Sequence, residues 1–396
     1  MDTEQFLNYN NIEDFFSHDL FVMNQSDKEK IHGKFLVNQV ENQIKNNRFM
    51  KKFYDSYNFT TKTLEKPNSI PPLPVQMFKK FDLRTCLEED VLRVLNSSAT
   101  TTGIPSKIYV DKTTSFRQSK GLTSITKNFI GKERKPYLVI DEDVNKGKTT
   151  VLTARGAAIR GFANFARNTT YIMDNIDGNL FLNIERLQEF CEKYQDQDIL
   201  AFGFTYIIWT RLIEEAKEKN IKVHLPNLKL LHGGGWKKLL DKAVSKEIFK
   251  QEVADFFGTD PSNIIDYYGM VEQLGVVFID CEYGYKHVPD FAEIVIRDFY
   301  SMEEVPTGND GLIECMSLLP TSYPGQALLT EDVGKIVGID DCKCGRKGKY
   351  FVFVARAEKA ELRGCGDTFA ERVTGSNKES EKKAQPGSMS KDDWDY

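Results

Sequence analysis

Residues 264–275 read IIDYYGMVEQLG, an apolar run that leads into Tyr267, Tyr268, Gly269 and the carboxylate of Glu272. Such a run predicts a strand, and a glycine at its end lets the backbone pass close to a flat ligand. An aromatic ring could stack on that ligand, and the carboxylate could hold a hydrated Mg²⁺. Tyr-Gly turns are common, and Glu272 could equally be a solvated surface residue. The stretch therefore predicts a strand that ends at a candidate binding site.

Short apolar runs alternate with amphipathic stretches along the rest of the chain. Strand alternating with helix predicts an α/β core with parallel strands, and the dominance of strands after residue 270 predicts a more antiparallel second half. We expect strands at 137–140, 199–204, 228–232, 276–280 and 292–298, and helices at 207–220 and 236–257.

The two ends of the chain do not follow this alternation of strands and helices. Ser26 is the candidate N-cap of a helix, and the proline-marked segment 68–81 is expected to be extended rather than helical. The polar, charged segment 374–396 has no periodicity, which predicts a disordered tail.

Length and composition exclude several classes of protein. The 396 residues suffice for two domains or for one large α/β domain with a smaller piece, and the net charge of -5 argues against a general nucleic-acid binder. The N-terminus lacks the features of a signal peptide, and no stretch approaches the ~18 apolar residues of a membrane span. Seven cysteines without a short disulfide framework favour a reduced, cytoplasmic protein.

A loop at 95–107, LNSSATTTGIPSK, concentrates hydroxyl groups before a Gly-x-Pro turn. Hydroxyls and free backbone amides are the donors that replace the water shell of a triphosphate. The loop is not the usual P-loop, because no lysine directly follows its glycine. A polar turn without a ligand explains it equally well. The candidate donors are Ser98, Thr100, Thr101, Thr102 and Gly103.

Two further motifs contain glycine. In LLHGGGWKK, His232 precedes three glycines, Gly233, Gly234 and Gly235, whose entropic cost favours close approach of the backbone to a ligand. In LLTEDVGKI, Asp332 is expected in a turn, where its carboxylate could accept hydrogen bonds from a ribose. Each motif alone is weak evidence.

The order of the motifs along the chain resembles that of the adenylate-forming acyl ligases. The motifs are the hydroxyl-rich loop, LHGGGWKK, YGMVE, TEDVG and Arg356. Segment 266–298 is most similar to their phenylacetate–CoA-ligase branch. Three segments carry a more specific resemblance, to the acyl-protein synthetases of bacterial luminescence fatty-acid reductase complexes. They are PPLPVQMFKKFDL, LHGGGWKK and AELRGCGDTFAERV. The resemblance extends from about residue 65 to residue 373.

This resemblance implies an α/β fold with a large adenylate-forming N-terminal domain of mixed sheets and flanking helices, followed by a truncated C-terminal stub. We expect a helical N-terminal part at 1–90, an adenylating core at 91–355, a hinge and stub at 356–373, and a tail at 374–396. It implies activation of a carboxylic acid by ATP and Mg²⁺ to an acyl-adenylate, and transfer of the acyl group to a thiol.

The resemblance also implies roles for residues that match the motifs. The hydroxyl-rich loop would face the β- and γ-phosphates, and Glu272 would hold Mg²⁺. Asp332 would take the ribose hydroxyls, and Arg356 would lie near the hinge and the ribose. The adenine would be framed by Gly233, Gly234, Gly235, Tyr268 and Gly269. The acyl pocket would contain Phe202, Phe204, Tyr206, Trp209 and His232, although such an aromatic stripe is more often core.

The chain departs from the family pattern in three ways, of which the third points to the acceptor. Either Thr100 replaces a glycine that is usual in the loop or one residue is inserted there, and Val271 stands where Thr or Ser is common. Only 40 residues follow Arg356, too few for the mobile C-terminal domain of related CoA ligases. Cys365, between two glycines, matches the acyl-accepting cysteine of the acyl-protein synthetases, since a thiolate is a strong nucleophile. The alternative is a small buried residue in a terminal strand.

Four residues offer the ligands of a tetrahedral zinc site, namely three thiols and one imidazole. They are Cys281, His287, Cys342 and Cys344. Their Cys-x-Cys spacing is tighter than the usual Cys-x₂-Cys, and His287 could instead be a core or acyl-pocket residue.

We interpret the chain as an ATP-dependent long-chain fatty acid–protein ligase. It would load Cys365 for handover to an acyl reductase, in a complex that also contains an acyl transferase. One alternative is adenylation followed by transfer to CoA or a carrier protein. A second, non-enzymatic alternative is a scaffold that binds nucleotide or acyl groups, which the altered loop supports.

Overall fold

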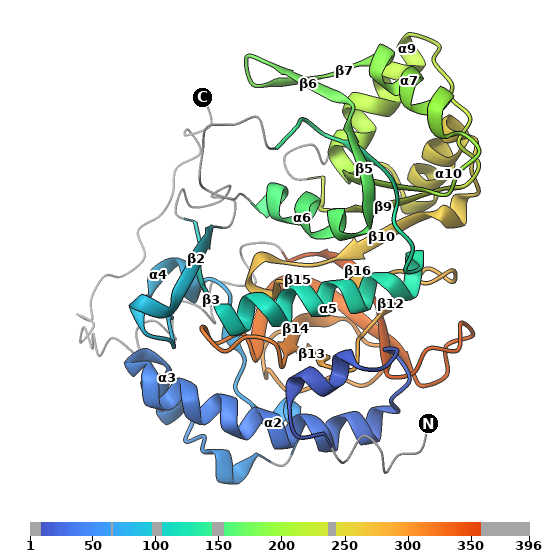
Figure 1. The fold of residues 1–396 in the computed structure, drawn as a ribbon. Coiled ribbons are helices and arrows are strands. Elements are labelled where there is room, and N and C mark those ends of the chain that lie inside the picture. The colour runs from blue at the N-terminus through green and yellow to red at the C-terminus, as the bar shows by residue number, and fades with distance from the viewer. Residues whose placement is uncertain (1–8, 65, 97–104, 145–153, 237–242, 358–396) are drawn as a thin grey trace, which may run out of the picture.

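The computed structural model describes residues 9–64, 66–96, 105–144, 154–236 and 243–357 (Figure 1). The hydroxyl-rich donors from Ser98 to Gly103, Cys365 and the predicted tail lie outside these described residues. Among the described helices, none has the length and apolar character needed to cross a membrane.

A six-stranded sheet forms the upper part of the molecule in Figure 1, in the order β11-β10-β9-β8-β4-β5. Its strands run parallel from β5 to β10, and only the short β11 pairs antiparallel. The predicted parallel α/β core is confirmed, and apolar clusters cover both faces, as is usual for parallel sheets. The strands are β4 (Lys135–Ile140), β5 (Ala166–Tyr171), β8 (Ile199–Phe204), β9 (Leu228–Gly233), β10 (Ile264–Tyr268) and β11 (Phe278–Ile279).

Helices connect these strands. The expected helix at 207–220 is present as α8 (Thr205–Ile207), a π-helical segment (Ile208–Ile213) and α9 (Glu214–Glu218). The expected helix at 236–257 is too long, because α10 spans only Lys246–Phe257. Ser245 caps its first turn by accepting a hydrogen bond from the Ile248 backbone N–H, and Trp236 is not helical. The other two helices are α6 (Ala154–Phe162) and α7 (Ile184–Tyr194).

A second sheet in the lower part has the order β12-β16-β15-β14-β13, and these five strands pair antiparallel, which confirms the predicted antiparallel second half, while β1 pairs parallel with β15. The expectation of a turn at Asp332 is wrong, because Asp332 lies within the long strand β15. Gly334 lets this strand pack closely, since a Cβ there would lie 2.7 Å from Ile313. The strands are β12 (Lys286–His287), β13 (Ala292–Arg297), β14 (Gly311–Ser317), β15 (Ala327–Ile339), β16 (Lys349–Arg356) and β1 (Leu73–Pro74), which pairs with β15.

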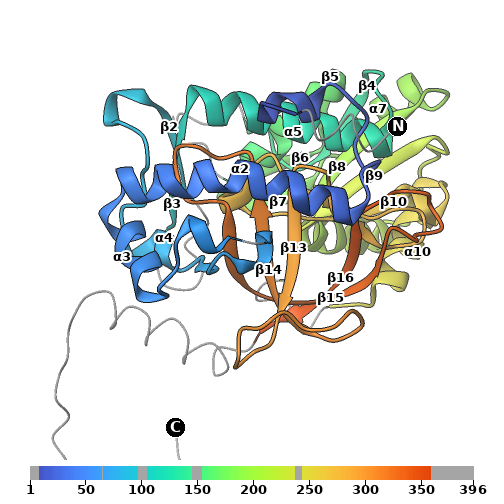
Figure 2. The ribbon, with the colours of Figure 1, turned by 90° about the horizontal axis from the view of Figure 1, so that it is seen from below.

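The N-terminal helices α2 (Gln25–Asn46) and α3 (Arg48–Ser56) belong to the lower part, and Figure 2 shows α2 lying along the antiparallel sheet. Asn24 rather than Ser26 is the N-cap, because its carbonyl accepts the first hydrogen bonds of the helix. Segment 68–81 is not extended throughout, since it contains the short helix α4 (Met77–Lys80).

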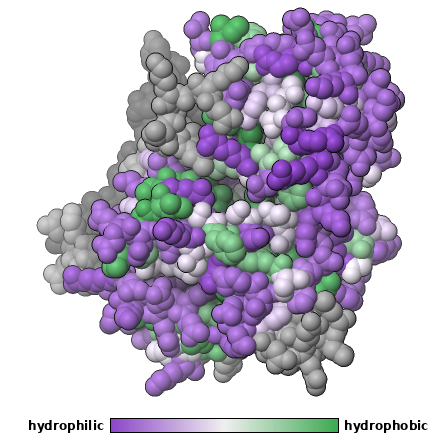
Figure 3. Space-filling model, in the orientation of Figure 1, coloured by the Kyte–Doolittle hydropathy of each residue, from purple (hydrophilic) through white to green (hydrophobic). Residues whose placement is uncertain are grey.

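Helix α5 (Lys112–Ile130) crosses in front of the junction of the two sheets in the view of Figure 1. Two hairpins complete the fold, β2 (Val91–Asn96) with β3 (Lys107–Asp111) and β6 (Met173–Ile176) with β7 (Asn179–Leu182). In Figure 3 a hydrophobic patch lies where Figure 1 places β2, whose Leu92 and Val94 are exposed. The 3₁₀ turns are η1 (Ile12–Phe16), η2 (Thr61–Thr63), η3 (Pro67–Ser69), η4 (Glu88–Asp90), η5 (Ala163–Phe165), η8 (Pro261–Asn263) and η9 (Val271–Gln273).

Candidate functional site

Tyr268 and Asp332 join the two sheets. The Tyr268 hydroxyl, at the end of β10, donates a hydrogen bond of 2.8 Å to Asp332 Oδ2 on β15. Burial raises the pKa of Asp332, while the hydrogen bond from Tyr268 and the charge of Arg356 oppose that rise. The structure thus brings together a tyrosine and an aspartate that are distant in the sequence, at the end of a parallel strand, where α/β sheets bind ligands.

Arg356 lies opposite Asp332 in the register of β15 and β16. Its guanidinium pairs with Glu331 at 3.0 Å, and its side chain is 67% exposed. The ring of Phe353, on the same strand, lies 6.0 Å from that of Tyr268 at an interplanar angle of 30°. Three predicted site residues, Tyr268, Asp332 and Arg356, are therefore neighbours at the edge where the two sheets meet.

Glu272 follows in the turn η9 and is 8% exposed. Burial raises the pKa of its carboxyl, and a hydrogen bond from Ser106 only partly offsets this effect. In the described part of the chain, no ion pair includes Glu272, and Lys79 acts on it only as a more distant charge. Glu272 is consequently a buried carboxylate without a neutralising partner among the described residues.

The glycines of the LHGGGWKK motif have neighbours within the protein. A Cβ on Gly233 would lie 2.7 Å from the Tyr267 ring, and Gly234 has a φ of +80°, which side-chain-bearing residues rarely adopt. A Cβ on Gly235 would meet open space, and one on Gly269 would lie 3.2 Å from Val277. The glycines at 233 and 234 are thus required by packing and by the turn itself, which are reasons the sequence analysis did not consider.

The predicted acyl-pocket residues fall on two faces of the parallel sheet. Phe202 and Phe204 lie in contact on β8, and Phe202 packs against Phe162 of α6. His232 and Trp209 lie on the opposite face, where both pack against Phe249 of α10. Phe202 and His232 are thus on opposite faces, whereas Phe204, at the end of β8, packs against the apolar clusters of both faces, and the half-buried Tyr206 packs with the second group.

His232 is buried in a polar network. Its Nδ1 lies 3.0 Å from the Thr205 hydroxyl and 3.8 Å from the Asp266 carboxylate. Burial lowers the pKa of His232 to about 4, so the imidazole is neutral at physiological pH. Asp266 in turn accepts a hydrogen bond from Lys286, which also bonds Asp280. No motif indicates this network, because its members are far apart along the chain.

The three cysteines and one histidine predicted as metal ligands do gather, and their ligand atoms all lie within 4.8 Å of one another. His287 comes from β12, and Cys342 and Cys344 come from the turn between β15 and β16. Each cysteine turn ends in a glycine with positive φ, Gly284 after Cys281 and Gly345 after Cys342, and the glycine N–H donates to the cysteine carbonyl. The cluster could hold a metal ion, and burial lowers the pKa of His287 to about 4, which keeps the ligating, neutral form.

Two residues of this site were missed by the sequence analysis. Ser106 hydrogen-bonds Glu272, and Glu331 pairs with Arg356. Ser106 is the second-last residue of the predicted loop 95–107, although it was not among the candidate donors, and it lies next to Glu272. The structure also describes Cys86, Cys191 and Cys315, which are free, and of these three only Cys315 is fully buried.

Residues 1–374 match the family model described as acyl-protein synthetase, LuxE. Two curated relatives are named long-chain-fatty-acid–luciferin-component ligase. The protein of Aliivibrio fischeri is 26% identical over 276 residues, covering 67% of this chain and 69% of the relative. The protein of Vibrio harveyi is 25% identical over 323 residues, covering 79% and 81% respectively.

Solved structures of a 2-hydroxyisobutyryl-CoA ligase are similar in fold. The complex with 2-HIB-AMP and CoA in the thioesterification state superposes with a TM-score of 0.63 at 15% identity, covering 91% of this chain and 74% of that chain. The postadenylation state with R3-HIB-AMP gives a TM-score of 0.63, covering 90% and 73%. The mixed α/β architecture is therefore like that of an adenylate-forming ligase.

Proposed function

The chain belongs to the LuxE acyl-protein synthetase family, and from this premise we propose that it activates a long-chain fatty acid with ATP and loads the acyl group onto Cys365. The fatty acid carboxylate attacks the α-phosphorus of ATP and pyrophosphate leaves. The Cys365 thiolate then attacks the acyl carbon of the adenylate and AMP leaves, so that a thioester is ready for an acyl reductase.

The uncompensated carboxylate of Glu272 is the observation that carries this proposal. A buried carboxylate with a raised pKa and no ion pair among the described residues favours binding of a cation. Carboxylate oxygens are ligands that Mg²⁺ prefers, and bound Mg²⁺ would offset the charge of the phosphates. Tyr268 and Asp332 support a nucleotide at the same edge, with the ring for the adenine and the carboxylate for the ribose.

The domain roles are part of the same proposal. Residues 91–355 would be the adenylating core, with 1–90 packed on it, and 356–373 would be a hinge and a short stub that carries Cys365. For the acyl group, the proposal keeps the face lined by Trp209 and His232, because these residues lie beside the Gly233 strand end. Phe202 and Phe204 would then support the sheet from behind.

Incubation with ATP, Mg²⁺ and a radiolabelled long-chain fatty acid tests the proposed reaction. We expect acid-dependent ATP–pyrophosphate exchange and label on the protein that hydroxylamine removes. Cys365→Ala should keep the exchange and lose the label, and Cys86→Ala is the matched control that should keep both. Label that appears only on added CoA would contradict the role of Cys365, and no exchange with any acid would contradict adenylation.

For the metal site, we propose that Cys281, His287, Cys342 and Cys344 hold a structural Zn²⁺, because three thiols and one imidazole within reach of one another suit its tetrahedral preference. Metal analysis of the wild type should find one zinc per chain, and Cys342→Ser with Cys344→Ser should abolish it. Wild-type protein that carries no zinc after expression with zinc in the medium would contradict the assignment.

A further inference from the structure

Aromatic rings gather at the end of β10, where the two sheets meet. Three phenylalanine rings surround that of Tyr268, with distances of 6.0 to 6.2 Å between ring centroids. Two of them, Phe278 and Phe351, are buried in the core, whereas the third, Phe353, is 43% exposed. Within the described residues, this group of rings is therefore closed on the side of the core and open at Phe353.

A β-bulge sets the face of the sheet on which Phe353 lies. Asp332 and Gly334 are two residues apart on β15, so they share one face. Arg356 stands opposite Asp332 on β16, and Phe353 stands opposite Gly334. Phe353 and Arg356 are three residues apart, and this odd spacing would place them on opposite faces of a regular strand. The register shifts between Val333 and Gly334, and this bulge brings Phe353, Asp332 and Arg356 to the same face.

The shared face is the one that Tyr268 contacts. The Tyr268 ring lies beside Phe353, and its hydroxyl donates a hydrogen bond of 2.8 Å to Asp332. Gly334, directly opposite Phe353, has no side chain that would cover the ring. An exposed ring and a carboxylate two strand positions away suit a nucleoside, because its base stacks on aromatic rings and its ribose hydroxyls donate hydrogen bonds.

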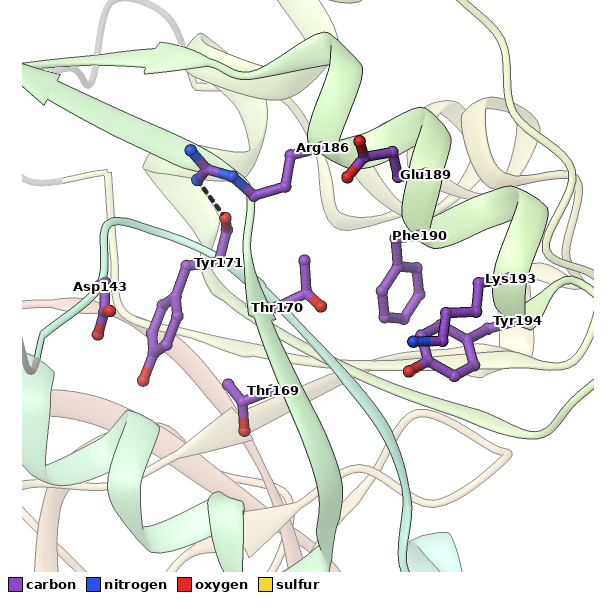
Figure 4. A pocket seen from close by; sticks show the side chains of 9 residues that line it. All are labelled: Asp143, Thr169, Thr170, Tyr171, Arg186, Glu189, Phe190, Lys193 and Tyr194. Atoms are coloured by element: carbon purple, nitrogen blue, oxygen red, sulfur yellow. Dashed lines mark hydrogen bonds between the residues drawn. The ribbon is translucent and has the colours of Figure 1, made fainter.

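The groove between β5 and α7 does not offer the base a second position (Figure 4). Its cavity volume is about 390 Å³, and it lies four strands along the sheet from β10. The rings in its lining, Phe190 and Tyr194, are buried in the core, and Arg186 is paired with Asp174 at 2.7 Å. Because these rings are buried, the groove presents no stacking surface comparable to that of Phe353.

We propose that Phe353 is a nucleotide-binding residue, whose exposed ring stacks with the base of ATP next to Tyr268 while Asp332 accepts hydrogen bonds from the ribose. Stacking on an aromatic ring requires only a planar base, so the proposal concerns affinity for the nucleotide and not the chemistry of the acid. The identity of the ligand rests on the proposed function. The role of Phe353 goes beyond it, because no motif indicates this residue.

Calorimetric titration of the full-length chain with ATP and Mg²⁺ tests the stack without requiring the reaction. Phe353→Ala should weaken binding about fivefold or more, as expected for the loss of one base–aromatic stack, and Phe353→Tyr should bind as the wild type does. Phe181→Ala is the matched control, because Phe181 on β7 is 44% exposed, and it should leave the affinity unchanged. Equal affinities of Phe353→Ala and the wild type would overturn the proposal.

Exchange kinetics distinguish a lost stack from a distorted site. In acid-dependent ATP–pyrophosphate exchange, Phe353→Ala should raise the KM for ATP about fivefold or more. The KM for pyrophosphate, which carries no base, should remain unchanged. An equal rise in both KM values would show that the whole site is distorted and would overturn the proposal. A wild type that binds ATP but shows no exchange would contradict the proposed adenylation, whereas the calorimetric comparison would still decide the role of Phe353.

Discussion

Glu272 and Glu293 are both buried glutamates, with exposures of 8% and 2%, but their surroundings differ in kind. The Glu293 carboxylate lies 3.5 Å from Lys28 Nζ and 3.6 Å from Lys349 Nζ, and it accepts a hydrogen bond of 2.6 Å from Gln25. Burial alone would raise the pKa of Glu293, but the two lysines outweigh it and hold the pKa at about 2.

The Glu272 region lacks such a partner. Burial raises the pKa of Glu272, and within the described residues a serine hydrogen bond is its nearest compensation. The difference shows which buried carboxylate is neutralised by side chains of the protein itself and which one is not. Around Glu293 the chain supplies the counter-charges and thereby fixes α2 on the antiparallel sheet, whereas around Glu272 a cation from outside would complete the site.

The largest expected effect is on stability and concerns the buried ion pairs of Glu293 with Lys28 and Lys349. Glu293→Gln leaves Lys28 and Lys349 buried without their shared carboxylate, and breaking such a pair costs about 3–5 kcal/mol of unfolding free energy. Urea unfolding measures the loss, with the exposed Glu303→Gln as control. Activity per folded molecule should remain, so a variant that unfolds normally but loses activity would break the comparison.

Glu272→Gln should have the opposite effects, a loss of activity without a loss of stability. Removing the charge that holds Mg²⁺ should lower acid-dependent ATP–pyrophosphate exchange by about 100-fold or more. The unfolding free energy should stay equal or rise, because a buried charge is removed. A variant with full exchange activity and normal Mg²⁺ dependence would show that Glu272 is only structural.

The bond between the sheets should have a smaller effect. Tyr268→Phe removes the hydrogen bond to Asp332 and should cost about 1 kcal/mol of stability, together with a several-fold rise in KM for ATP. Steady-state kinetics at varied ATP concentration measures the second effect. Tyr300→Phe is the matched control, since Tyr300 is 90% exposed. An unchanged KM would argue against a nucleotide at this edge.

The pH dependence of the unfolding free energy should differ between the two glutamates, because each unit of pKa shift changes that free energy by about 1.4 kcal/mol. The pKa of Glu293 is lowered, so the advantage of the wild type over Glu293→Gln is present above pH 4.5 and shrinks as the pH falls toward 2. The pKa of Glu272 is raised, so the stability of Glu272→Gln relative to the wild type should increase as the pH rises above 4.5. Unfolding curves across this range measure both, and parallel curves would refute the difference.

The smallest effect on stability is expected for Arg356. Its pair with Glu331 is largely exposed, so Arg356→Gln should change the unfolding free energy by less than about 0.5 kcal/mol. If Arg356 acts at a hinge beside the ribose, exchange activity should nevertheless fall. Loss of stability without loss of activity would contradict that role.

Much of the fold could be predicted from the sequence because its signals are local. The run ILAFGF is strand β8 with the expected bounds, and the strands after residue 270 do form an antiparallel sheet. The predicted gathering of the three cysteines and one histidine is also confirmed, since the chemistry of those residues restricts what they can do together.

Other features depend on contacts that the sequence does not display. The position of Asp332 between two apolar runs predicts a turn, yet pairing with β14 and β16 carries β15 through Asp332 and Gly334. The aromatic stripe from Phe202 to Trp209 was interpreted as one surface, but the change from strand to helix at Thr205 places its two ends on opposite faces of the sheet. The groove beside β5 arises only when α7 packs against the sheet, so no motif indicates it.

Identification of the product of the first half-reaction tests the central claim most directly. Full-length Cys365→Ala, incubated with ATP, Mg²⁺ and a long-chain fatty acid and then quenched, should contain acyl-adenylate and pyrophosphate in equal amounts by mass spectrometry. Formation of ADP with an acyl phosphate, or hydrolysis of ATP that does not depend on the acid, would contradict adenylation at the Glu272 site.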